Sequence, residues 1–171
     1  MYVFDATPLI SLASADRLAL VTSLDGPRYM PESVYDEVVT AGLDGGHADA
    51  RRIERAVENE VLAVEPDPDP DVSLVERLSR VDALSGADVA VLALAGERGG
   101  TAIMDEAYGR SVSDAEGIAT RGTAYVVLHA QRRGAIGPEE SRAAIDDLLD
   151  AGWYCAPDLY ARILEKIEEI D

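Results

Sequence analysis

Four acidic residues, Asp5, Glu37, Asp88 and Asp105, stand where a carboxylate can do chemistry. Asp5 and Asp105 each follow a short apolar run that is typical of a buried strand. A carboxylate at the carboxyl end of a parallel strand points into the crevice where open α/β sheets bind ligands. Carboxylates that converge there repel one another unless a hard divalent cation lies between them. The pattern therefore predicts a Mg²⁺ or Mn²⁺ site and phosphoryl-transfer chemistry.

Each of these acids also has an ordinary structural explanation. Asp5 and Asp105 can cap the helices that follow them. Asp88 has capping-box spacing with the serine three residues before it, but it also shares a predicted helix face with buried apolar residues, so it needs a partner. Asp36 and Glu37 flank the apolar stripe of one helix on opposite sides, and periodicity cannot choose between them.

Thr7 and Pro8 bear on the role of the first acid, Asp5. Pro8 suits the first turn of a helix, and Thr7 directly before it can be the cap of that helix. With Thr7 as the cap, the Asp5 carboxylate would be available for a role other than capping. The Thr7 hydroxyl could also hydrogen-bond a metal-bound water.

The acids must be positioned by elements that alternate along the chain, which favours a βαβ fold with a parallel sheet. Strands are predicted at residues 2–5, 29–30, 61–64, 101–104 and 118–120. Helices are predicted at residues 8–13, 17–24, 32–41, 47–60, 85–96, 106–115, 124–133, 138–151 and 157–170, and a capping-box pattern at Ser73 and Glu76 predicts one more. We expect one domain over residues 1–171.

The composition describes a globular chain. Its 171 residues are 47% apolar and only 5% aromatic, so aliphatic side chains must fill the core. No segment reaches the roughly 20 apolar residues that a membrane span needs, and the N-terminus shows neither a basic region nor a cleavage site. Cys155 is the single cysteine, which excludes a disulfide framework and a thiolate zinc site. We expect a cytoplasmic protein with no membrane partner.

The charge is unusual, with 33 acidic and 15 basic residues and a net charge of -18. Acid dispersed along a chain whose only lysine is Lys166 favours a halophilic protein, with a generic acidic protein as the alternative. Such a charge repels nucleic acid in dilute buffer, but at about 1 M salt the Debye length is only about 3 Å. An RNA substrate must then be held by the local site, with Arg110 the first candidate for a phosphate contact and Arg98 and Arg121 weaker ones.

Four segments, in order along the chain, resemble the PIN-domain family of metal-dependent nucleases, which includes the VapC-type toxins. They are residues 2–10, 31–38, 85–95 and 103–110. Residues 122–123, the small-residue helix after them and residues 133–136 resemble one prokaryotic subgroup. Members of that subgroup often carry Glu one residue after the glycine of the Ser85-Gly86 segment, where this chain has Ala87, so Asp88 must serve.

The resemblance implies a three-layer α/β/α sandwich with a central parallel sheet of about five strands. It matches Asp5, Glu37, Asp88 and Asp105 to the family's catalytic, metal-binding quartet. Thr7 matches the hydroxyl position that supports the first acid, and Glu106 or Asp114 could supplement Asp105.

The implied activity is a Mg²⁺- or Mn²⁺-dependent endoribonuclease that cleaves single-stranded or structured RNA. In a toxin–antitoxin pair it would be a homodimer with an antitoxin protein as partner. The alternative is a non-catalytic PIN-like module that binds RNA or a protein. A phosphatase of the haloacid-dehalogenase kind needs a second Asp where Thr7 stands, and a receiver domain needs a lysine near Thr123, so both are disfavoured.

Two remaining features receive structural interpretations. His47 and His129 are expected to be surface or packing residues. The apolar stripe of the helix at residues 157–170, formed by Leu159, Ile163, Leu164 and Ile167, is expected to pack on the core rather than on a second subunit.

Overall fold

Five short parallel strands form the centre of the molecule, whose residues 1–170 are described by a computed structural model. The strands are β1 (Tyr2–Phe4), β2 (Arg28–Pro31), β3 (Ala63–Glu65), β4 (Thr101–Ile103) and β5 (Ala119–Arg121). Their order is β3-β2-β1-β4-β5, and all four neighbouring pairs are parallel. Since β1 is central, Val3 and Phe4 are fully buried.

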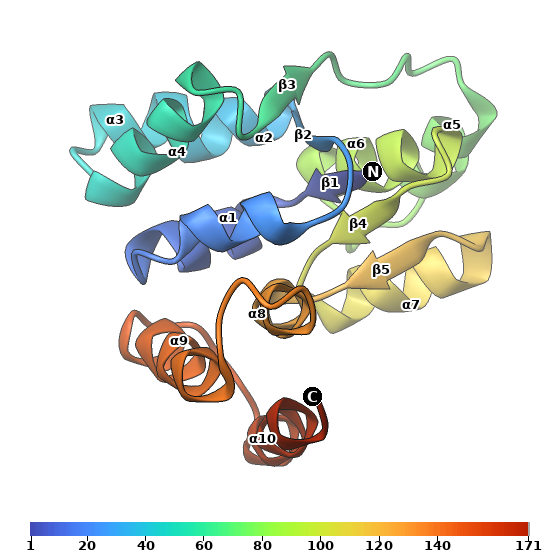
Figure 1. The fold of residues 1–171 in the computed structure, drawn as a ribbon. Coiled ribbons are helices and arrows are strands. Elements are labelled where there is room, and N and C mark those ends of the chain that lie inside the picture. The colour runs from blue at the N-terminus through green and yellow to red at the C-terminus, as the bar shows by residue number, and fades with distance from the viewer. Residues whose placement is uncertain (171) are drawn as a thin grey trace.

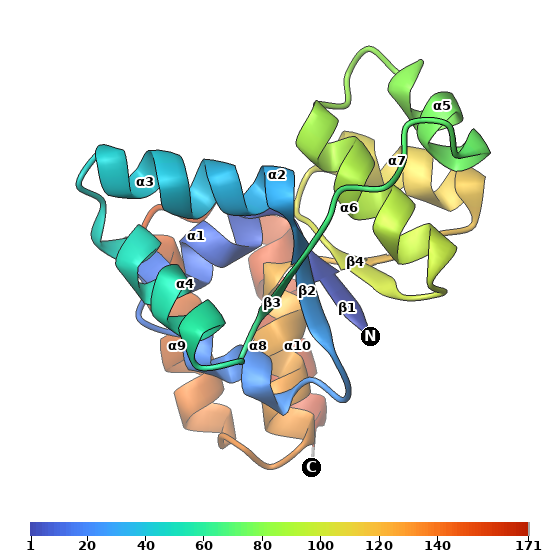
Figure 2. The same cartoon turned by 90° about the horizontal axis from the view of Figure 1, so that it is seen from above.

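Helices cover both faces of the sheet, as an all-parallel sheet requires. Figure 2 shows α5, α6 and α7 on one face, and α1, α4 and α8 on the other with α9 and α10 outside them. The helices of the first group are α5 (Ser73–Ser79), α6 (Gly86–Glu97) and α7 (Ala107–Glu116). Those of the second are α1 (Ala6–Ser14), α4 (Ala48–Glu58), α8 (Thr123–Arg132), α9 (Pro138–Asp150) and α10 (Pro157–Glu169). The predicted three-layer α/β/α architecture is confirmed.

The core is aliphatic, and α6 is its most deeply buried helix. Every residue from Val89 to Ala95 is buried, because α6 lies between the sheet and α5. A helix that is apolar all round is the expected sequence for this position. Asp88 at its first turn is therefore held next to a tightly packed scaffold.

One helical stretch departs from regular geometry. Residues 32–44 run through α2 (Glu32–Tyr35), a π-helical turn (Asp36–Thr40) and α3 (Ala41–Asp44), as Figure 1 shows at its upper left. The apolar pattern predicts a regular helix at residues 32–41. A π-helical turn widens the helix by one residue per turn and often accompanies functional sites.

Three local predictions are wrong. The stretch predicted as a helix at residues 17–24 is a 3₁₀ helix, Leu18–Ser23. Thr7 does not cap the first helix, since α1 begins at Ala6 and Asp5 occupies the cap position. The helix α5 begins after Val72 and has no side-chain cap, so Ser73 does not form a capping box with the glutamate three residues on.

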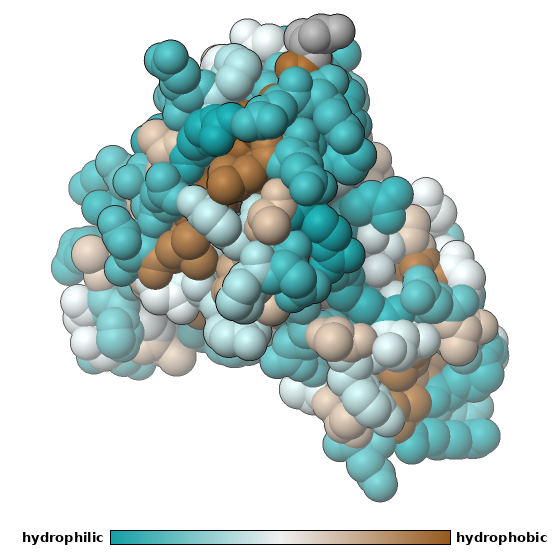
Figure 3. Space-filling view, turned by 90° about the horizontal axis from the view of Figure 1, so that it is seen from below, coloured by the Kyte–Doolittle hydropathy of each residue, from teal (hydrophilic) through white to brown (hydrophobic). Residues whose placement is uncertain are grey.

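The C-terminal helix and the histidines have the expected structural roles. In α10, Ile163 and Ile167 are buried, and the helix packs on α8 and α9. On the face seen from below, mainly hydrophilic side chains surround small hydrophobic patches (Figure 3). His129 is buried with its ring 5.5 Å from that of Tyr125, while His47 is exposed. No helix within residues 1–170 is both long and apolar enough to cross a membrane.

Candidate active site

The strand order places a change of direction between β1 and β4. From β1 the chain proceeds outward to β2 and β3, and later from β4 outward to β5 on the other side. Ligands of open α/β sheets bind at such a switch point, beyond the carboxyl ends of the strands. Asp5 directly follows β1, and its amide donates to the carbonyl of Ile103 at the end of β4, 3.0 Å away. The acids after β1 and β4 therefore meet at this edge.

Asp5 is the buried acid of this edge, with only 5% of its surface exposed. Although it stands at the cap position of α1, its side chain forms no capping hydrogen bond. The pKa of the Asp5 carboxyl is raised from 3.8 to about 7, mainly by burial and also by the negative charges of Asp88, Glu37 and Glu106, while a hydrogen bond from the Ala6 amide acts in the opposite direction. A carboxyl group in this condition gains strongly from a bound cation.

The three acids that act most strongly on Asp5 come from separate elements. Asp88 lies in the first turn of α6, Glu37 in the π-helical turn, and Glu106 directly before α7. The fold brings them together only through the sheet, because long stretches of chain separate their positions. The charges of Glu37 and Asp88, both of the predicted quartet, and of Glu106 thus act on Asp5.

Asp88 has a structural role as well. Its carboxylate accepts a 2.7 Å hydrogen bond from the Ser85 amide, and the Ser85 hydroxyl accepts a 3.1 Å bond from the Asp88 amide. The predicted capping box is confirmed. The box fixes the orientation of Asp88 at the start of α6 and leaves its second oxygen without a hydrogen bond from residues 1–170.

The structure distinguishes Glu37 from its neighbour Asp36, which periodicity left open. Glu37 is exposed and its charge acts on Asp5. Asp36 instead accepts a 3.2 Å hydrogen bond from the Thr40 hydroxyl in the next turn. Both residues lie in the π-helical turn, which no sequence pattern signals.

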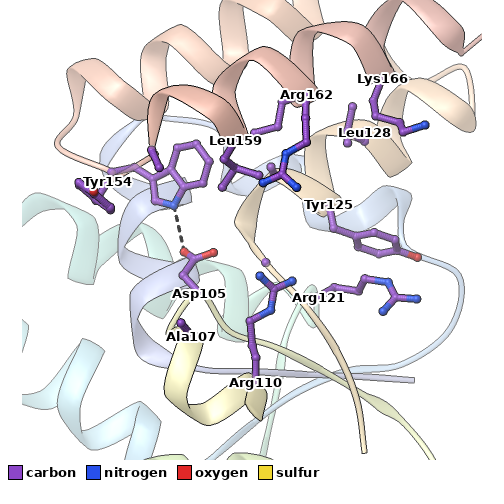
Figure 4. A pocket seen from close by; sticks show the side chains of 15 residues that line it. Asp105, Ala107, Arg110, Arg121, Tyr125, Leu128, Tyr154, Leu159, Arg162 and Lys166 are labelled. Atoms are coloured by element: carbon purple, nitrogen blue, oxygen red, sulfur yellow. Dashed lines mark hydrogen bonds between the residues drawn. The ribbon is translucent and has the colours of Figure 1, made fainter. Parts of the chain in front are cut away.

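Asp105 points elsewhere. It accepts bonds from the Thr123 amide (2.7 Å), the Thr123 hydroxyl (2.6 Å) and the indole N–H of Trp153 (3.0 Å), the last drawn in Figure 4. Three donors on one half-buried carboxylate tie the end of β4 to the N-terminus of α8, where a negative charge is favoured, and to the chain between α9 and α10. Asp105 is thus held as an anchor, and its neighbour Glu106 is the acid of this segment whose charge acts on Asp5.

Gly122 makes this anchor possible. A Cβ atom on Gly122 would lie 2.9 Å from an Asp105 carboxylate oxygen, which is too close. The signal in the sequence is the Gly122-Thr123 pair after the last strand. That pair does not reveal the third member of the anchor, because Trp153 lies 48 residues from Asp105 along the chain.

The remaining candidate residues lie outside the carboxylate group. Thr7 and Asp114 are exposed, in α1 and α7. Arg98 forms a 2.6 Å ion pair with Glu65 and lies over the ring of Tyr29, so it is occupied structurally. Arg110 projects from α7 into a cavity beside Asp105.

The carboxylates at this edge suit a divalent cation that binds oxygen and takes only one or two ligands from the protein. Within residues 1–170, no three His, Cys, Asp or Glu side chains lie close enough to hold a metal ion as they are arranged. Mg²⁺ usually keeps several waters and is bound through one or two carboxylates together with substrate phosphates. Asp5, buried among like charges, supplies the chemistry of such a site without a closed protein cage.

Comparison with known proteins adds one finding. A family model described as a PIN domain matches residues 1–169. No curated protein and no solved structure matches the chain significantly.

Proposed function

Because the chain belongs to the PIN-domain family, whose members are generally nucleases, we propose that it is a Mg²⁺- or Mn²⁺-dependent endoribonuclease acting on single-stranded or structured RNA. The observation that carries the proposal is Asp5, a buried carboxyl at the switch point of the sheet with three further acids acting on it. A purely structural buried acid would have several hydrogen-bond donors around it, as half-buried Asp105 has, whereas the donor that acts on Asp5 is the Ala6 amide.

The residues divide into direct and indirect roles. Asp5 and Asp88 would hold the metal, Glu106 would join them, and Glu37, exposed at the rim, would orient water. A bound divalent ion polarises the phosphodiester, favours a hydroxide nucleophile and stabilises the leaving oxygen. Asp105 supports the site by fixing the end of β4, from which Glu106 projects.

A non-catalytic PIN-like module is the second candidate, and one observation favours it. As the side chains of residues 1–170 lie, they form no three-ligand metal cluster, and Asp88 has one oxygen committed to its capping box. Such a module would keep the fold and bind RNA or a protein without cleaving.

The biological setting is a further part of the proposal. A toxin role predicts a homodimer and an antitoxin protein encoded beside this gene. The charge of -18 with a single lysine supports a halophilic host. Sedimentation measurements test the homodimer. RNA cleavage in molar KCl, compared with cleavage in dilute buffer, tests the halophilic host.

The test of the function combines metal binding with cleavage. Mn²⁺ binding would be measured by calorimetry in molar KCl for the wild type, Asp5→Asn and the exposed control Asp114→Asn, alongside cleavage of a fluorophore–quencher RNA. We expect binding and cleavage in the wild type and the control, and neither in Asp5→Asn. A folded wild type that binds no Mn²⁺ would overturn the nuclease proposal in favour of the binding module.

A further inference from the structure

A cavity of about 650 Å³ opens next to Asp105, between α7, α8 and α10 (Figure 4). It is large enough for one or two nucleotides and lies within the range of ordinary ligand pockets. Asp105 lines it, two residues after Ile103, whose carbonyl accepts from the Asp5 amide, so the cavity lies at the same edge of the sheet as Asp5. From this cavity we infer a nucleotide subsite, an inference that rests on the proposed function.

The charge of the cavity is opposite to that of the protein. Four of the chain's 15 cationic residues line it: Arg110, Arg121, Arg162 and Lys166. The only acid in its lining, Asp105, is already bound by three donors. A cleft lined by one sign of charge concentrates ligands of the opposite sign, here on a protein of net charge -18.

Three of these cations have little or no competition from acids, whereas Lys166 forms a 2.6 Å ion pair with exposed Glu169. Within residues 1–170, Arg110 and Arg121 form no ion pair, and a 2.7 Å bond to the Thr120 carbonyl orients Arg121. Arg162 pairs only with exposed Asp158 one turn away, a type of pair worth little. Figure 4 shows the guanidinium groups of Arg110 and Arg162 directed toward each other across the cavity. Two facing guanidinium groups suit a shared phosphate, which each can bind through two N–H groups.

The floor of the cavity is apolar and partly aromatic. Leu128, Leu159 and Ile163 are part of its lining, and the guanidinium of Arg121 lies 5.6 Å from the centre of the Tyr125 ring. At the mouth, Tyr154 is 85% exposed, which is rare for so large a side chain. Aromatic faces beside a cationic groove are the combination that binds single-stranded nucleic acid.

The ligand must therefore carry both a phosphate and a planar apolar group. A nucleotide of single-stranded RNA has both, and its neighbouring phosphate would reach the carboxylate edge. An acidic peptide matches the charge, but it does not use the facing guanidinium pair or the exposed tyrosine as well. The cavity is assigned to the base and phosphate next to the scissile bond.

The test uses metal-free protein, so that binding is separated from cleavage. Trp153, the only tryptophan, lines the cavity and reports on it by fluorescence. AMP and a fluorescein-labelled hexaribonucleotide would be titrated in EDTA into wild type, Asp5→Asn, the double variant Arg110→Gln/Arg162→Gln and the double control Arg51→Gln/Arg80→Gln. The control removes the same charge from exposed positions on α4 and at the end of α5.

We expect the wild type and the control to bind alike, Asp5→Asn to bind at least as tightly because it loses a negative charge at this edge, and the cavity variant to bind at least tenfold more weakly. The slope of log affinity against log salt concentration for the hexanucleotide should become shallower by about one for each arginine–phosphate pair removed. Arg110→Lys/Arg162→Lys should recover only part of the affinity, which a loss of folding would not explain.

Equal affinity of RNA for Arg110→Gln/Arg162→Gln and for the control Arg51→Gln/Arg80→Gln would overturn the subsite. Tighter binding of a hexaglutamate peptide than of RNA would overturn it as well. Cleavage that persists in the cavity variant at wild-type kcat/KM would also refute it while leaving the nuclease intact. Nucleotide binding without any metal-dependent cleavage would instead refute the nuclease and retain the subsite.

Discussion

Replacing Asp5 by Asn should stabilise the metal-free protein at neutral and alkaline pH. The carboxyl of Asp5 has a pKa of about 7 in the folded chain against 3.8 ordinarily. The folded state therefore holds its proton more tightly than the unfolded state, and stability falls as the pH rises from about 4 to about 7. Asn has no proton to lose, so the variant escapes this fall.

The size of the effect follows from the two pKa values. Each tenfold change in proton affinity corresponds to about 1.4 kcal/mol, so the full difference is roughly 4 kcal/mol. This is a large fraction of the roughly 5–15 kcal/mol that is typical of domains, and it is an upper value because ionised Asp5 attracts counterions and water. Below about pH 4 both states are protonated, and the two proteins should be equally stable.

The assay is urea unfolding in EDTA at several pH values between 4 and 9, for wild type, Asp5→Asn and Asp114→Asn. The difference between wild type and Asp5→Asn should grow through this range and level off above about pH 8, while the exposed Asp114 control follows the wild type. Saturating Mn²⁺ should then stabilise the wild type by about 2.7 kcal/mol at a hundredfold excess over Kd, and the variant not at all. A difference that does not vary with pH would refute the assignment of Asp5 as a buried acid that holds its proton.

Further predictions concern the support of the site. Asp105→Asn should lower the free energy of unfolding by about 1–3 kcal/mol, because an amide can accept at only one of the two oxygens now bonded to Thr123 and the indole; urea titration measures this, and unchanged stability would contradict the anchor. Gly122→Ala should displace the same carboxylate and shift tryptophan emission, whereas an unshifted spectrum would count against it. Ser85→Ala should lower the free energy of unfolding by about 0.5–2 kcal/mol because it removes the α6 cap, and unchanged stability would show that the cap is dispensable. Glu106→Gln should weaken Mn²⁺ binding more than Asp105→Asn does in calorimetry, and the reverse order would return Asp105 to the metal site.

Much of the fold could be predicted because its signals are local. Apolar runs of three or four residues ending in an acid indicate the parallel strands, and Ser85 with Asp88 indicates a helix start that the structure confirms. The errors arise where a local rule has a close competitor. Thr7 and Asp5 both suit a cap, and only the packing of α1 against its neighbours decides that the helix starts at Ala6.

The sequence by itself determined that Asp5 and Asp105 follow strands of a parallel sheet, and parallel strands all end at the same edge. Tertiary structure decided which acids act on Asp5. At the end of β4, Asp105 and Glu106 are adjacent, and consecutive residues of an extended chain point to opposite sides. The donors of Thr123 and Trp153 turn Asp105 toward α8, while the charge of Glu106 acts on Asp5. The cationic cavity likewise exists only because α10 packs on α8 and α9, which brings Arg162 across from Arg110 of α7.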